Sequence, residues 1–220
     1  ALLMSILMPA LSRVKRMAKA AACKMHLHQW SLIWNIYCQD NDNRFCHATR
    51  ASDGRGWPRG RWIKALRSQW ATKSDILRCP MAVKPPVGTD NIRHGSSVNT
   101  YQMGDKVEDK CSYGMNCWMY NPRPEDYDRG TIQGRPVEWN WKTPDVKGGH
   151  RIPVFADSMW RGGGPISGDP VEEQAAPGLN RERSNPPAYS DEWTGANAEM
   201  KHFCIDRHNG RINMLFVDGH

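Results

Sequence analysis

The chain has 220 residues, which is enough for one ordinary domain with an appendage and too few for several independent cores. Ten tryptophans and 39% hydrophobic residues exclude an intrinsically disordered protein, while 19 glycines and 15 prolines indicate many turns. The net charge of +7 permits contact with DNA, anionic lipid or acidic polysaccharide. The basic residues are spread along the chain, however, and this pattern is more typical of solvated helix faces than of a polyanion site.

The first 39 residues are predicted to form one long helix. Strong helix formers dominate, and no turn signal occurs before Asp40. Apolar side chains recur near the helical period, at Ala10, Leu11, Val14, Met17, Ala18, Ala21, Met25 and Leu32. Pro9 predicts a kink in this helix. The apolar residues 1–10 cover only about 15 Å, against about 30 Å for the hydrocarbon core, and basic residues follow them, so they are neither a membrane span nor a signal peptide.

The C-terminal segment has two apolar runs separated by Asn-Gly at 209–210, which predicts a β-hairpin. Asn and Gly both tolerate the positive φ angles of a type I′ turn. We therefore expect His208 to face Arg211 across the turn and Phe203 to pair with Phe216. Both faces of the hairpin are apolar, which predicts an inner position in a sheet with one side against the helix.

Several segments follow one another in the order of a known bacterial family. His208 is separated by nine residues from Asp218-Gly219. The other segments are Asp40 to Asn43, Cys79-Pro80, Ser112 to Asn116, and Val154 to Asp157. Together with the opening ALLMSILMPALSRVKRMAKAAACKMHLHQW, they resemble type IV pilin-like proteins, including type II secretion pseudopilins, that carry a C-terminal H-x9-DG motif. The family's opening Phe-Thr-Leu-Ile-Glu segment is absent, so we expect either that the chain begins inside a longer apolar helix or that the protein is processed differently.

The resemblance implies an α+β fold: a stalk helix (1–39) packed on the small antiparallel sheet of a head (40–220) with long loops, which ends in the β-hairpin (202–220). It implies a structural subunit of a helical filament, outside the cell or in its envelope, anchored in the inner membrane through a longer N-terminus before assembly. Identical neighbours related head-to-tail can each bury the exposed apolar stripe of the next subunit, and this contact can repeat without limit along a filament. We expect the assembly surface to consist of Leu2, Leu3, Ile6, Leu7, Met8, Pro9 and Leu11.

Two other functions stay open at this point. One is a pseudopilin of a type II secretion system, which the sequence hardly separates from a pilus subunit. The other is a secreted module whose basic and Trp-rich surfaces bind nucleic acid or polysaccharide, with a steep dependence on salt. The sequence contains no nucleophile elbow, HExxH, kinase set or Walker motif, so we predict that the protein is not an enzyme.

The seven cysteines include no C-x-x-C pair, which removes the usual zinc-knuckle and thioredoxin signatures. This favours disulfides in an oxidising compartment, with at least one thiol left unpaired within the chain. Cys38 with Cys46, and Cys111 with Cys117, lie close enough in sequence to close short loops.

No cofactor is predicted, and calcium is the one metal that the sequence leaves open. Asp40 and Asp42 belong to an oxygen-rich turn that suits a hard cation, although such turns also end helices without an ion. Asp157 and Asp218 are alternative ligands, each at the end of an apolar run. His208 and Asp218 are expected about 20 Å apart along the hairpin, which favours a structural role for each.

The middle of the chain mixes short apolar pieces with turn signals. The segment 57–70 alternates aromatic and basic residues; it predicts an amphipathic helix packed on the head, with base or sugar stacking as the alternative. Short strands and ordered loops are expected at 98–103, 117–120 and 137–141. The glycines at 162–164 and the Pro-rich run that follows predict an exposed excursion without regular structure.

Overall fold

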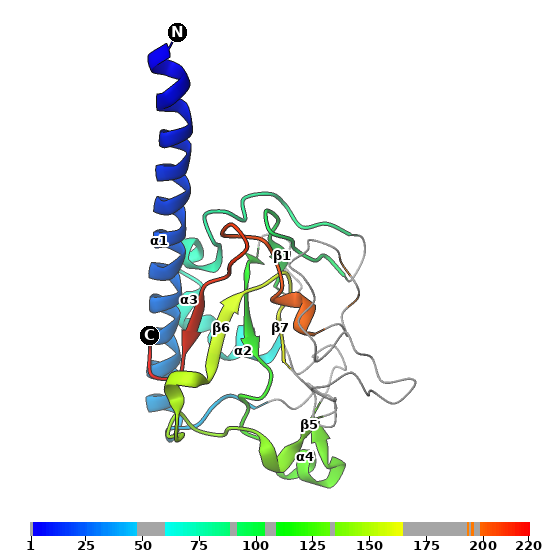
Figure 1. Ribbon diagram of the computed structural model, residues 1–220. Helices are drawn as coiled ribbons and strands as arrows, with labels where there is room; N and C mark the ends of the chain where they lie inside the picture. Colours follow the sequence, from blue (N-terminus) through cyan, green and yellow to red (C-terminus); the bar gives the residue numbers. More distant parts are fainter. Residues whose placement is uncertain are drawn as a thin grey trace, which may run out of the picture.

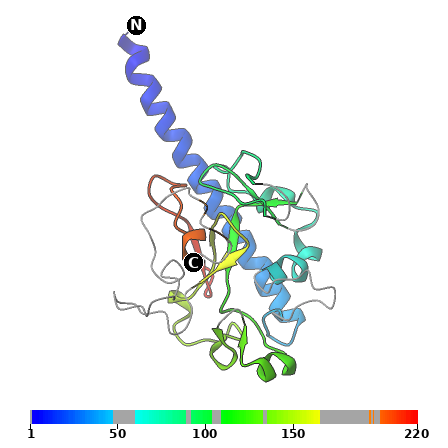
Figure 2. The same cartoon turned by 90° about the vertical axis from the view of Figure 1, so that its right-hand side faces the viewer.

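The structure is a computed structural model that describes residues 2–47, 60–88, 92–103, 109–132, 135–164, 193, 195 and 199–220. Helix α1 (Leu2–Asp40) lies along one side of a head that contains a small sheet, and its N-terminal half extends far beyond that head (Figures 1 and 2). This confirms the predicted α+β class with a long N-terminal helix.

The head is built from short elements. In chain order they are α2 (Arg61–Ala65), α3 (Arg67–Trp70), the 3-10 helix η2 (Ser74–Leu77), β1 (Tyr101–Gln102), β2 (Lys110–Cys111), β3 (Tyr113–Asn116), α4 (Pro124–Arg129), β4 (Thr131–Ile132), β5 (Arg135–Pro136), the 3-10 helices η3 (Val137–Trp139) and η4 (Gly149–Arg151), β6 (Pro153–Asp157), β7 (Gly162–Gly163), the 3-10 helix η6 (Met200–His202) and β8 (Met214–Phe216). The main sheet has the order β7-β3-β6-β8. Its β3–β7 pair is parallel and its other two pairs are antiparallel, so the sheet is mixed.

Side chains alternate between the two faces of the main sheet, as the pleat of a β-strand requires. On β6, Phe155 and Asp157 point toward α1, where Phe155 packs on Trp30 with ring centroids 5.4 Å apart. Between them, Ala156 points to the opposite face and lines a pocket with Asn116 of β3. The helix therefore covers one face of the sheet and leaves the other to the head's loops.

Aromatic rings fill the space between α1, α2 and the sheet. Trp30, Trp34 and Trp62 each lie 5.1 to 5.7 Å from the ring of Phe155, centroid to centroid. The indole N–H groups of Trp30 and Trp62 donate to the carbonyls of Ile76 and Arg161, so these buried polar atoms are satisfied. In the described part of 57–70, the predicted amphipathic helix is present as α2 and α3, which bury Trp62, Leu66 and Trp70.

Helix α1 continues through Pro9 without the predicted kink, and Figure 1 shows a straight stalk. Proline removes one hydrogen bond of the helix and crowds the preceding turn. The described part of α1 nevertheless runs on from Pro9 to Asp40 along a single axis.

The C-terminal turn forms as predicted, but the hairpin does not. Asn209 and Gly210 have φ angles of 59° and 73°, and the N–H of His208 donates to the carbonyl of Arg211 at 3.0 Å. The predicted pairing of Phe203 with Phe216 is wrong, because the chain before the turn forms η6 and β8 pairs with β6 instead. Strand β8 is consequently at the edge of the sheet, although it does contact α1 as expected.

The glycines predicted to begin an exposed excursion are buried. Gly162 and Gly163 form β7, which pairs with Met115 and Asn116 of β3. A Cβ atom on Gly163 would clash with the carbonyl oxygen of Glu199, so this position has no room for a side chain. The expectation for the Pro-rich run at 169–190 lies outside the described residues.

Candidate functional site

An apolar stripe runs along the face of α1 that points away from the head. In the protruding half, the side chains of Leu7, Leu11 and Val14 are 63%, 66% and 62% exposed. The stripe continues beside the head through Met25, Leu32 and Ile36, which are also exposed. Residues spaced by three, four or seven positions lie on one side of a helix. We call these six residues the outer stripe.

A second apolar face of α1 is buried against the head. Its core members are Leu27, Trp30 and Trp34, which are at most 3% exposed. Successive residues of a helix turn by about 100°, so Met25 and Leu27 point in nearly opposite directions. The C-terminal half of α1 is thus apolar on two opposite sides, one covered by the head and one open.

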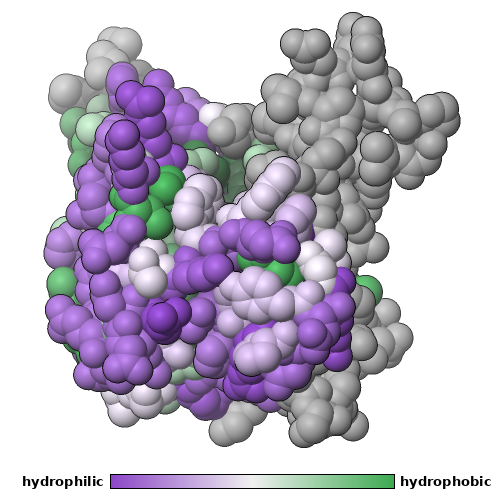
Figure 3. Space-filling view, turned by 90° about the horizontal axis from the view of Figure 1, so that it is seen from below, coloured by the Kyte–Doolittle hydropathy of each residue, from purple (hydrophilic) through white to green (hydrophobic). Residues whose placement is uncertain are grey.

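Of the predicted assembly residues, the structure places Leu7, Met8, Pro9 and Leu11 in exposed positions on the protruding half. The side chains of Leu2, Leu3 and Ile6 lie outside the described residues. By contrast, the end of the head farthest from the protruding helix is mainly hydrophilic, with only small apolar patches (Figure 3). Among the described helices, none combines the length and hydropathy needed to cross a bilayer.

Four potential metal ligands gather beneath α1: Cys23, Cys79, Asp157 and His208, which we call the buried cluster. Their ligand atoms all lie within 4.8 Å of one another. The four come from distant parts of the chain: the middle of α1, the segment after η2, the end of β6 and the turn before β8.

The contacts inside the buried cluster are short. Cys23 Sγ lies 3.6 Å from each oxygen of Asp157, and Cys79 Sγ lies 3.4 Å from Nε2 of His208. The same Nε2 lies 3.2 Å from Oδ2 of Asp157. The side chains of Asp157 and His208 are 0% and 7% exposed. The cluster is therefore a closed, almost dry set of two sulfurs, one nitrogen and one carboxylate.

Neighbouring groups satisfy the rest of the cluster. Arg207 donates from Nη1 to Oδ1 of Asp157 at 3.0 Å, and the N–H of Asn213 donates to Oδ2 at 2.9 Å. The hydroxyl of Tyr113 donates to Cys23 Sγ at 3.3 Å. These donors all favour negative charge on the atoms that they contact.

The pKa values follow these contacts. The hydrogen bond with Cys79, and then burial, raise the pKa of the Cys23 thiol above its usual range. Burial alone would raise the pKa of Asp157, but the hydrogen bond from His208 and the charge of Arg207 outweigh it and lower that pKa. Burial would lower the pKa of His208, but the hydrogen bond with Asp157 and further contacts with Cys23 and Asp157 raise it to about 9.

The predicted calcium ligands lie elsewhere. Asp40 and Asp42 are exposed in the turn that ends α1, where the Asn41 side chain donates to the carbonyl of Tyr37. Asp218 is bound to His220, with Nδ1 to Oδ1 at 2.6 Å, and does not belong to the buried cluster. Of the alternatives weighed from sequence, Asp157 is the one that joins a group of three or more potential ligands within the described residues, and its sulfur neighbours do not suit calcium.

All seven cysteines are buried as free thiols. The predicted bond between Cys111 and Cys117 is wrong for a geometric reason: they flank the extended strand β3. Six residues at about 3.3 Å each separate their Cα atoms by roughly 20 Å, far beyond the roughly 7 Å that a disulfide can bridge. Cys38 and Cys46, at the two sides of the turn after α1, are likewise unbonded.

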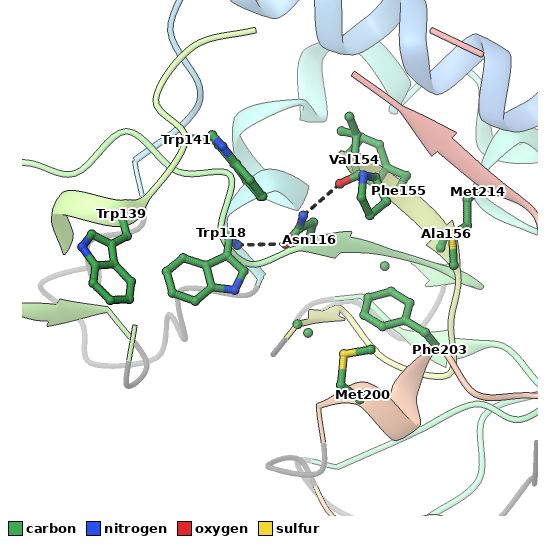
Figure 4. Close-up of a pocket in the computed structure, with 14 residues that line it drawn as sticks. Asn116, Trp118, Trp139, Trp141, Val154, Phe155, Ala156, Met200, Phe203 and Met214 are labelled. Carbon is green, nitrogen blue, oxygen red and sulfur yellow. Dashed lines mark hydrogen bonds between the residues drawn. The ribbon is translucent and has the colours of Figure 1, made fainter. Parts of the chain in front are cut away.

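A pocket of about 440 Å³ opens on the sheet face opposite α1. Trp118, Trp139 and Trp141 line one side of it, and Met200 and Phe203 line the other (Figure 4). Its polar side chain is Asn116, which donates to the carbonyl of Pro153 and accepts from the N–H of Trp118. No charged residue lines the pocket within the described part of the chain, so it offers ring faces to a neutral ligand.

The comparisons add no relative. No family model, curated protein or solved structure matches this chain.

The sequence identified the stalk surface more readily than the buried cluster. The outer stripe can be read from the helical periodicity of the apolar residues in the sequence. Cys23, Cys79, Asp157 and His208 each lie in a segment that was compared above with pilin-like proteins, but no spacing rule links them to one another. Their common location in those segments is the one signal that would have grouped them.

Proposed function

We propose that the protein is a structural subunit of a pilus-like helical filament, assembled through α1. The observation that carries this proposal is the outer stripe, an exposed apolar line along a helix whose N-terminal half extends beyond the head (Figure 1). A soluble monomer rarely exposes contiguous apolar surface of this kind, whereas an identical neighbour can cover it.

Magnitudes favour many neighbours over one. Full burial of a Leu, Val or Met side chain contributes about 1.5–3 kcal/mol, so a pair that fully buried the three stripe residues of both protruding halves would gain on the order of 9–18 kcal/mol. This is an upper bound, because these side chains are already about one-third buried. Association costs about 4–15 kcal/mol, which makes a single helix pair marginal. A bundle in which each helix meets several copies repeats the gain, and head-to-tail contacts that do not close produce an open helical filament.

The resemblance to type IV pilin-like proteins supports the same conclusion, with a place outside the cell or in its envelope and inner-membrane anchoring through a longer N-terminus before assembly. A periplasmic pseudopilus of type II secretion uses the same contact and differs in length and partners. The proposal needs no catalytic group.

The double variant Leu7→Glu with Leu11→Glu tests the proposal. Both side chains are exposed and lie far from the core, so the melting temperature of the head is expected to stay unchanged. Filaments seen by cryo-electron microscopy, and protein in the high-speed pellet, are expected to disappear, because charges would be buried in the helix bundle.

Ser12→Glu is the control for position, since it places a glutamate in the same part of α1 on another side of the helix and adds one of the two negative charges that the double variant adds. It is expected to reduce assembly far less than the double variant. Filaments that persist in the double variant, or native processed protein that is monodisperse and globular, would contradict the proposal.

The Trp-lined pocket favours a second function, in which the head binds a neutral polysaccharide. Trp139 is 63% exposed at its rim, and aromatic faces give large contact area at a small entropy cost. Trp139→Ala is expected to weaken binding of neutral oligosaccharides at least tenfold by calorimetry, without a change in melting temperature. Equal affinity in the variant, or tighter binding of acidic oligosaccharides that falls steeply with salt, would argue against this pocket.

A further inference from the structure

We propose that the buried cluster binds one Zn²⁺ ion, which ties the stalk helix to the head. The ligands would be the two sulfurs, Nε2 of the histidine and a carboxylate oxygen. This proposal is independent of filament assembly, because it concerns how the subunit itself is held together.

The distances between ligand atoms fit a tetrahedron around zinc. Bonds of about 2.3 Å to sulfur and about 2.0–2.1 Å to nitrogen and oxygen imply separations of roughly 3.3 Å for N–O and roughly 3.5 Å for S–N and S–O. Three of the six separations are 3.2 Å between Nε2 of His208 and Oδ2 of Asp157, 3.4 Å between Cys79 and His208, and 3.6 Å between Cys23 and the same Oδ2. The other three are at most 4.8 Å. Little movement would be needed to admit the ion.

The donor set selects among metals. Thiolates are soft ligands, which disfavours calcium and magnesium and favours zinc over harder cations. Four protein ligands in a closed, nearly dry position are typical of a structural site, whereas a catalytic site keeps a position open for water. Of the His208–Asp157 pair, only His208 keeps some solvent exposure, and it borders a cavity together with Arg207 and Asn209.

The surroundings supply hydrogen bonds of the kind that support metal ligands. The Tyr113 hydroxyl and the N–H of Met81 donate to the sulfurs of Cys23 and Cys79, and Arg207 holds the oxygen of Asp157 that faces it. The charges also balance: two thiolates and one carboxylate carry three negative charges, against two on zinc and one on Arg207. A buried site with no net charge avoids the large cost of an unpaired charge.

The chief alternative is a disulfide between Cys23 and Cys79. The structure places both as free thiols. A disulfide would also leave the donors from Tyr113 and Met81 aimed at weakly accepting sulfurs, and it would give no reason for a histidine and a carboxylate to converge on the same point. The metal accounts for all four groups.

Metal content of the full-length protein, purified without chelators, is the first measurement. Elemental analysis is expected to find one zinc per chain. Replacement by Co²⁺ is expected to give thiolate-to-cobalt absorption in the near ultraviolet together with the visible bands of tetrahedral cobalt. Cys79→Ser is expected to lower zinc affinity at least tenfold and weaken the thiolate band, while Cys204→Ser, which removes a buried thiol outside the cluster, leaves both unchanged.

If Cys79→Ser does not fold, the wild-type protein still decides the question. Removal of metal by a chelator is expected to lower the melting temperature, and Zn²⁺ added back is expected to restore it with a one-to-one end point. Protein without zinc whose melting temperature ignores added Zn²⁺ would overturn the proposal. A Cys23–Cys79 disulfide, found by mass spectrometry after alkylation of the native protein, would overturn it as well.

Discussion

Arg207→Met is expected to lower the free energy of unfolding by about 3–5 kcal/mol. The guanidinium is fully buried and pairs with Asp157. The carboxylate of Asp157 is also fully buried, and the substitution would remove its partner of opposite charge. It also donates to the carbonyls of Ser96 and Ser112, each at 2.6 Å, and to two further carbonyls. Met fills similar volume but offers no donor, so several buried acceptors would remain unsatisfied.

Urea denaturation followed by tryptophan fluorescence measures this loss. Arg211→Met is the matched control, because Arg211 is exposed four residues away in the same turn region. Its effect is expected to stay within about 0.5 kcal/mol. Similar losses for the two variants would mean that Arg207 acts through general charge and not through its buried contacts.

Phe155→Ala is expected to cost about 3–5 kcal/mol of unfolding free energy. The ring of Phe155 lies at the centre of the aromatic core, with Trp30, Trp34 and Trp62 all within 5.7 Å between centroids. The four rings come from three elements, α1, α2 and β6, so truncation would open a cavity that no single side chain can fill. Part of the loss would come from edge-to-face contacts, worth about 0.5–1.5 kcal/mol per aromatic pair.

Chemical denaturation gives the magnitude, and near-ultraviolet circular dichroism is expected to show weaker signals from the tryptophans that surround the cavity. Trp139→Ala serves as the control, since it removes a larger ring that is 63% exposed. It is expected to cost less than about 1 kcal/mol. A Phe155→Ala protein as stable as this control would show that the core collapses without penalty.

Local signals in the sequence predicted local structure well. The long run of helix formers predicted α1, and the Asn-Gly pair at 209–210 predicted a turn with two positive φ angles. Pairing between distant segments was not predictable in this way. The apolar run that ends at Phe216 found its partner in β6 and not in the adjacent run, because burial against α1 and β6 outweighs the short connection of a hairpin.

The candidate sites differ in the same way: one can be predicted from local sequence signals and the other depends on contacts between distant segments. The helical periodicity of apolar residues is enough to predict the outer stripe, because this prediction does not depend on how the head folds. The buried face of α1 carries Trp30 and Trp34, and only tertiary packing decides that these face inward. The buried cluster depends on four separate chain segments, and short-range spacing between cysteines pointed instead to disulfides that the extended strand β3 makes impossible for Cys111 and Cys117.

One unbroken helix carries both the outer stripe and the face that packs on the head. The number of residues between Val14 and Cys23 therefore sets the angle, about the helix axis, between the protruding part of the stripe and the head. One inserted residue would rotate the protruding part of the stripe by about 100° about the helix axis relative to the head, whereas seven would rotate it by only about 20°. In an assembly built on this helix, the number of residues in this part of α1 would thus determine the direction in which each head points. Helices that differ by seven residues here would present their heads in nearly the same direction, whereas helices that differ by one or two residues would not.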